Sequence, residues 1–168
     1  EENFASRLLA AVFGTEMSSR LFQSVRERLG LCYSIIGYPT AYENNGAFII
    51  YTSMNPDSVE LAVSAIKREI ELLLSDGITV QELKKGKEQI VTSMVLGQES
   101  TSAVMRGMGR HAVVTGKLYD IDEQIAKVEA LTCGDVSDAA RRIFDFDRMS
   151  ASMVSASVSD VRKMMRGA

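Results

Sequence analysis

Two side chains with fixed hydrogen-bond donors, Arg26 and Tyr33, stand seven residues apart in the chain. Arg26 comes near the C-terminal end of a predicted helix, and Tyr33 comes at the start of the next predicted strand. A tight turn at 29–31 (Leu-Gly-Leu) between them can bring the guanidinium and the phenol to one cleft edge. There both groups can donate to a peptide carbonyl, and to the oxygen that becomes negative in a tetrahedral intermediate.

Each of these residues also has an ordinary structural interpretation. Arg26 can pair with a nearby acid, or sit at the C-terminus of its helix, where a cation is favoured. Tyr33 can be a half-buried aromatic residue of a strand. The residues alone leave both alternatives open. For the neighbouring Arg20 and Arg28 we expect solvent-exposed or helix-capping roles.

The other reactive side chains argue against metal or nucleophilic chemistry within this chain. His111 is the only histidine, whereas zinc hydrolases normally take at least two ligands from histidine or cysteine. A catalytic triad would need His111 itself as the base, so we expect a packed or surface histidine. Cys32 and Cys133 form no C-x-x-C motif or disulfide framework. We interpret Cys32 as a buried or spectator thiol.

Composition narrows the class of protein further. The chain has 168 residues, 46% of them hydrophobic, which predicts a single domain over residues 1–168. Its formal charge of -3 lacks the basic footprint of a nucleic-acid-binding protein. No apolar run approaches the roughly 20 residues that cross a bilayer, and there is no secretory signal pattern. We therefore expect a soluble protein, and the cysteine usage favours the cytoplasm.

Apolar periodicity and capping residues predict a chain that is mostly helical. Capping pairs at Thr79 with Glu82, Asp120 with Glu123, and Thr132 with Asp135 mark three helix starts. Methionines at 94, 105 and 108 recur near helical spacing and are interpreted as core filling. The predicted helices cover 3–13, 18–30, 55–77, 79–98, 100–116, a short segment from 120, 132–144 and 159–166.

Three segments are predicted as strands. Residues 31–38 and 46–54 are rich in β-branched and aromatic residues, and the turn signal at 44–46 (Asn-Asn-Gly) predicts an antiparallel pair. Residues 149–155 alternate loosely enough to form a third strand. The order of elements indicates an α+β fold, an antiparallel sheet with helices packed on one face. Because three strands are few for so many helices, we expect this domain to lack its first strand here.

The stretch 17–34, MSSRLFQSVRERLGLCYS, is the most distinctive of the chain. It resembles the signature of the second domain of the insulinase or pitrilysin family, which includes the mitochondrial processing peptidase and its bacterial relatives. The resemblance covers nearly the whole chain in order. It continues through Tyr38-Pro39, Asn55-Pro56-Asp57, Gly77-Ile78-Thr79, Lys87-Glu88-Gln89, Gly97-Gln98-Glu99-Ser100, Leu131-Thr132 and Asp135-Val136.

The resemblance implies the non-zinc half of a processing-peptidase-like zinc metalloendopeptidase. In this family zinc sits in another domain on an inverted H-x-x-E-H motif, with a glutamate acting on the attacking water. A chain with one histidine cannot hold that motif, so zinc is expected in the parent enzyme and not in this chain. The family's arginine and tyrosine on the substrate side of the cleft match Arg26 and Tyr33. One departure is Glu16, where the family often has glycine.

The resemblance also implies partners. The zinc-motif domain is expected in the same polypeptide or in a second subunit, a homodimer is implied, and the substrate is an extended polypeptide. The chain by itself is expected to be inactive. The alternative is a catalytically inactive family member that serves as a structural or peptide-binding subunit.

Overall fold

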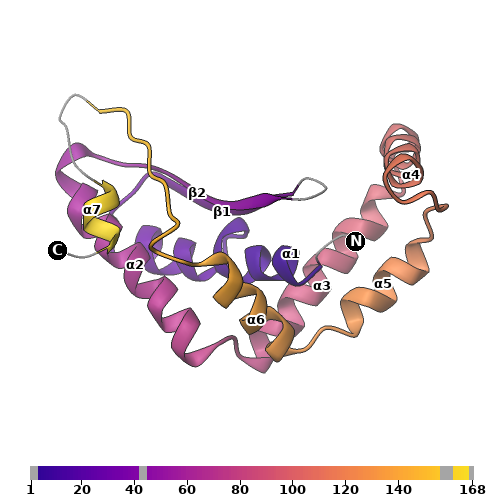
Figure 1. The fold of residues 1–168 in the computed structure, drawn as a ribbon, viewed down its shortest axis with the longest axis horizontal. Helices are drawn as coiled ribbons and strands as arrows, with labels where there is room; N and C mark the ends of the chain where they lie inside the picture. The colour runs from indigo at the N-terminus through magenta and orange to yellow at the C-terminus, as the bar shows by residue number, and fades with distance from the viewer. Residues whose placement is uncertain (1–3, 42–44, 156–160, 167–168) are drawn as a thin grey trace.

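The computed structural model describes residues 4–41, 45–155 and 161–166. Figure 1 shows an elongated molecule in which a β-hairpin runs above α1, while α2 and α3 diverge from the lower edge. The predicted turn at 44–46 and the predicted helix starts at 3 and 159 fall partly outside the described residues. The elements are α1 Phe4–Ala10, η1 Ala11–Thr15, η2 Phe22–Arg28, β1 Ser34–Ala41, β2 Gly46–Ser53, η3 Pro56–Ser58, α2 Val59–Asp76, α3 Val80–Gly97, α4 Thr101–Thr115, α5 Ile121–Glu129, α6 Cys133–Ile143 and α7 Val161–Arg166.

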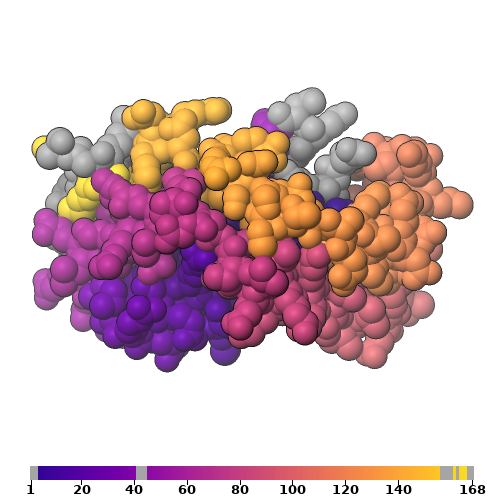
Figure 2. Space-filling view, turned by 90° about the horizontal axis from the view of Figure 1, so that it is seen from below, coloured from indigo at the N-terminus to yellow at the C-terminus, as the bar shows by residue number. Residues whose placement is uncertain are grey.

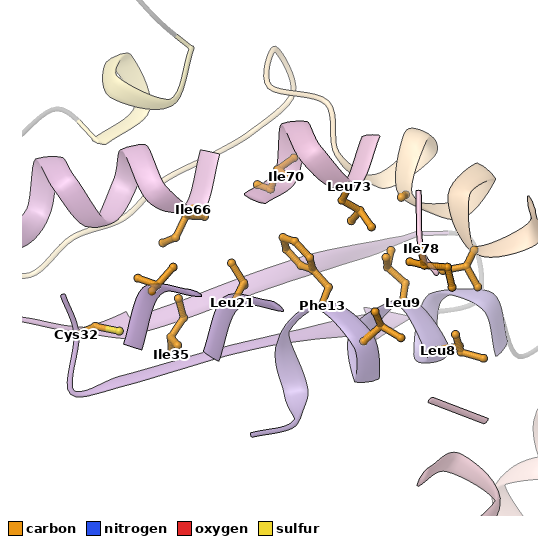
Figure 3. Packing of buried hydrophobic residues seen from close by; sticks show 14 of the residues in the cluster. Leu8, Leu9, Phe13, Leu21, Cys32, Ile35, Ile66, Ile70, Leu73 and Ile78 are labelled. Carbon is orange, nitrogen blue, oxygen red and sulfur yellow. The ribbon is translucent and has the colours of Figure 1, made fainter. Parts of the chain in front are cut away.

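The first helical segment forms the centre of the core. α1 continues directly into the wider π-helical turn η1, and together they contact β1, α3 and α6. In Figure 3, apolar side chains of α2 face those of the N-terminal helices: Ile66, Ile70 and Leu73 lie opposite Leu21, Phe13 and Leu9. α1 and η1 are therefore buried on several sides, in keeping with their nearly continuous apolar sequence.

The two strands form an antiparallel ladder from Ser34 opposite Ser53 to Ala41 opposite Gly46. Ile35 is buried on the helix side, and Phe48 packs partly buried against the same core. Phe13 and Phe144 extend this contact, since the ring of Phe144 lies 5.1 Å from each of the other two rings. The predicted α+β fold with an antiparallel sheet and helices on one face is confirmed.

The first strand begins three residues later than predicted. The backbone N–H groups of Leu29, Gly30 and Leu31 donate to the carbonyls of Ser24, Arg26 and Val25 in the preceding helix. These N–H groups bond to carbonyls at the end of the helix that would otherwise lack partners, so they cannot pair with a neighbouring strand. Gly30 has a φ of 62°, a conformation that favours glycine over residues with a side chain.

Helix starts in the second half follow the predicted caps. Thr79 with Glu82 and Thr132 with Asp135 form complete capping boxes, and Asp120 caps α5. Asn55, predicted as a cap, makes no side-chain capping bond, and a short 3-10 turn at Pro56 leads into α2 instead. α6 packs against α2, and the orange and magenta surfaces adjoin in Figure 2.

Two predictions about the second half are wrong. Residues 149–155 form no strand, and the sheet of the described residues has two strands. Met94 is buried as predicted, but Met105 and Met108 are exposed, because α4 buries none of its residues within the described part of the chain. Met149 and Met153 pack against the core, so residues 149–155 lack a strand partner and not burial. For α4, no element of the described part of the chain buries its side chains.

Candidate functional site

Arg26 lies near the end of η2, where a ring beneath it holds the guanidinium. The guanidinium carbon lies 4.6 Å from the centroid of the Phe22 ring, one helical turn earlier. The nearest acid in contact, Glu27, is 3.9 Å away, at the limit of an ion pair between two exposed groups. The Arg26 side chain is 39% exposed. Stacking therefore fixes its plane while its donors stay accessible to a ligand.

Tyr33 lies beyond the turn, one residue before β1. Its backbone N–H donates to the carbonyl of Ser53 over 2.8 Å, which ties Tyr33 to the last residue of β2. Tyr33 is 69% exposed, so the alternative of a half-buried strand aromatic does not describe it. The backbone is held while the phenol remains free to meet a partner.

The residues between the two candidates place them at the same end of the hairpin. The N–H of Gly30 donates to the carbonyl of Arg26, and the N–H of Leu31 to that of Val25, both within 3.1 Å. Burial raises the pKa of the Cys32 thiol, while a hydrogen bond with Thr52 and the positive charge of Arg26 act in the opposite direction. The hydrogen-bonded turn therefore brings the backbones of Arg26 and Tyr33 to the same end of the hairpin.

The raised pKa keeps Cys32 in the thiol form at neutral pH, since only the thiolate is a nucleophile. Cys32 is also buried, in agreement with its interpretation as a spectator. His111 is half-buried, and its ring meets that of Tyr119 edge-on at 5.5 Å. Among the described residues, no group of three or more histidine, cysteine, aspartate or glutamate side chains can hold a metal ion. The donor set of these residues does not fit zinc.

Arg20, the nearest alternative to Arg26, is fully engaged in the fold. Its Nε and Nη2 donate to the two carboxylate oxygens of Glu82 over 2.6 and 2.8 Å. Nη2 also donates to the carbonyl of Gly77, the residue that ends α2, over 2.8 Å. The capping role expected for Arg20 is confirmed. The same Glu82 closes the capping box with Thr79, so the Arg20–Glu82 pair links the segment just before η2 to the end of α2 and the start of α3.

This network predicts a stability that depends on pH. Burial opposes ionisation of Glu82, but the hydrogen bonds from Arg20 and Thr79 outweigh it and lower the pKa of Glu82 from 4.5 to about 2. Because the folded pKa is depressed, the stabilisation is complete above pH 4.5 and is lost as the pH falls towards 2. We expect Glu82→Gln to lower the unfolding free energy by about 2 kcal/mol at pH 7, allowing for solvent screening of this partly exposed pair.

Denaturant unfolding of both proteins at pH 7 and pH 2.5 measures this effect. The difference between wild type and Glu82→Gln should shrink at the lower pH. Glu88→Gln is the matched control, because Glu88 is exposed and its Lys84 partner lies 3.9 Å away. An equal loss in both variants would show that the Arg20 network contributes nothing beyond a surface pair.

Glu16, where the family often has glycine, is accommodated without strain. Its φ of -98° and ψ of 158° are extended values that any residue adopts. Its carbonyl accepts a hydrogen bond from the N–H of Ser19 over 3.0 Å. The residue that needs to be glycine here is Gly14, because a side chain there would meet the backbone of Gly37 on β1.

Comparison with known proteins identifies the family. The model of the peptidase M16 inactive domain matches residues 1–90. The chain belongs to the peptidase M16 family. An uncharacterized zinc protease of Bacillus subtilis is 37% identical over 140 residues, which is 83% of this chain and 34% of that protein. The predicted membership in the insulinase or pitrilysin family is therefore confirmed, and the match is to its inactive domain.

Solved structures share the fold. A peptidase M16 inactive domain from Pseudomonas fluorescens has a TM-score of 0.74 at 22% identity, covering 84% of this chain and 34% of that one. A protease from Helicobacter pylori has a TM-score of 0.75 at 20% identity, covering 86% and 35%. The inactive domain described here spans about a third of the length of the curated relatives it matches.

Two further observations complete the description of this M16 inactive domain. No helix among the described residues is long and apolar enough to cross a membrane.

Phe22 is a positioning residue that the sequence did not single out, since its apolar character assigned it to the buried stripe of the helix. The available signal was its spacing: an aromatic residue four positions before an arginine on one helix face.

Proposed function

We propose that this inactive domain is the substrate-binding half of a zinc metalloendopeptidase, the half that holds no metal. Arg26 and Tyr33 donate hydrogen bonds to the scissile carbonyl and to the oxyanion of the tetrahedral intermediate. The observation that carries the proposal is their arrangement: two exposed donors on either side of the Gly30 turn, each held by its backbone. The family membership supplies the context, because relatives are named zinc proteases.

The proposal divides the chemistry between two parts of the parent enzyme. Zinc is held outside this chain, on an inverted H-x-x-E-H motif in the same polypeptide or in a second subunit. In a homodimer each inactive domain can serve the zinc-bearing domain of its partner. The role of the present residues is to orient an extended polypeptide and to stabilise negative charge as it develops.

A direct test compares the 168-residue chain with the full-length protein on unstructured fluorogenic peptides. The full-length protein is expected to cleave them, to lose activity with a chelator and to regain it with zinc. The chain alone is expected to give no hydrolysis at any zinc concentration, because its described residues hold no metal-ligand group. Hydrolysis by the chain alone that survives repeated purification would contradict this division of labour.

The alternative function is a structural or peptide-binding subunit without catalysis. The same experiment separates the two functions. A full-length protein that binds labelled peptides but holds no zinc and cleaves nothing would be such a subunit, and Arg26 and Tyr33 would then serve binding alone.

A further inference from the structure

The outer face of the hairpin carries an apolar surface that the fold leaves exposed. Ile36 lies opposite Tyr51, and Tyr38 lies opposite Ile49, so the four side chains form two successive cross-strand pairs on one face. All four are exposed, while Ile35 and Gly37 on the opposite face are buried. We call these four residues the hairpin track. In Figure 1 the helix α1 lies below the hairpin, on the side of the buried residues.

The hairpin track starts three residues along the strand from Tyr33 of the candidate site. Tyr33 is paired through its N–H with Ser53, the residue that follows Tyr51 by two. At about 3.3 Å per strand residue, the first pair lies roughly 10 Å and the second roughly 16 Å along the strand from Tyr33. An extended peptide held by Arg26 and Tyr33 would therefore span about three residues before it reached the first pair of the track.

We infer that the hairpin track binds apolar side chains of the extended substrate, roughly three and five residues from the scissile bond. This inference rests on the proposed function of Arg26 and Tyr33. An extended peptide presents alternate side chains to one face with the same two-residue period as the track. The occupant is thus an extended polypeptide with apolar residues at alternate positions, and the track selects for it.

Three fluorogenic peptides test the inference in the full-length protein. One carries phenylalanine at the third and fifth residues before the cleaved bond, one carries it at the third and fifth after, and one carries serine throughout. We expect one phenylalanine peptide to exceed the serine peptide about tenfold in kcat/KM. In the Ile36→Thr/Ile49→Thr variant this ratio should fall below about threefold, because threonine keeps the β-branched shape and removes apolar surface.

The ratio between peptides is unaffected by a general loss of folded protein, so it distinguishes a binding role from a structural one. Val113→Thr is the matched control, since Val113 is 87% exposed on α4, away from the hairpin. It should leave the ratio as in the wild type. A wild-type protein that does not discriminate between the peptides, or a double variant with an unchanged ratio, would overturn the inference.

The two proposals fail separately. Arg26→Lys should slow cleavage of all three peptides while preserving their ratio. If Arg26→Lys has no effect but the ratio still depends on the two isoleucines, the proposed function fails and the track stands. If the full-length protein cleaves none of the peptides, fluorescence anisotropy on zinc-stripped protein supplies the same test. The preference should then appear in Kd, and equal Kd values would overturn the inference.

Discussion

Arg26→Ala or Tyr33→Phe in the full-length protein is expected to lower kcat on an unstructured peptide by about 10²-fold to 10³-fold. Removing one donor to an oxyanion typically has this effect, because the lost bond is strongest in the transition state. The zinc content, measured by metal analysis, should stay at the wild-type level, since neither residue belongs to a metal-ligand group. KM should change much less than kcat.

Arg28→Ala is the matched control for this prediction. Arg28 lies two residues further along the same helix and is exposed. Its loss removes the same charge from the surface and should leave kcat near the wild-type value. Unchanged peptide hydrolysis in both Arg26→Ala and Tyr33→Phe would count decisively against the role proposed for these residues.

Gly14→Ala is expected to cause the largest loss of stability of any single methyl addition in the chain. A Cβ at this position would lie 2.5 Å from the Cα of Gly37 and 2.7 Å from its backbone nitrogen. Because the added methyl group would clash with the backbone of β1, η1 and the strand would have to move apart. That movement would strain the hydrogen bond from the Thr15 hydroxyl to the Gly37 carbonyl. We expect a loss of about 3 kcal/mol in the unfolding free energy, from overpacking.

Thermal or denaturant unfolding measures this loss, and Gly107→Ala provides the matched control. A Cβ at Gly107 would meet nothing within 4 Å, and the residue lies in the middle of α4. The same chemical change there should stabilise the protein by about 0.5–1 kcal/mol, because alanine favours the helix. A Gly14→Ala variant as stable as the wild type would mean that the contact between η1 and β1 is looser than described.

Secondary structure was predictable where its cause is local. A capping box depends on residues three positions apart, and both predicted boxes form with the expected partners. The start of β1 could not be placed, because the N–H of Leu31 serves the preceding helix, and the strand-like composition of 31–33 does not reveal this. For residues 149–155 the alternation indicates only that a strand is possible, since a partner must also lie beside it.

The candidate site was predictable in part. The sequence named Arg26 and Tyr33 and the turn between them, and the structure places both at one end of the hairpin with exposed side chains. It could not show that Phe22 stacks under the guanidinium, since an apolar residue on a helix is compatible with burial or with a cation contact. The role of the pair in catalysis stays a prediction until the variants are measured.

By itself the sequence determined the hairpin and most of the helices, where most helices begin, and that a chain with one histidine cannot hold an H-x-x-E-H motif. Those properties depend on near neighbours or on a simple inventory of side chains. Only the tertiary structure decided that Arg20 bonds to Glu82 and to the Gly77 carbonyl while Arg26 keeps its donors accessible. It also decided that α4 stays exposed and that the outer hairpin face is apolar. Which side chains are buried and which stay accessible depends on contacts between residues distant in sequence, and a local sequence pattern does not specify those contacts.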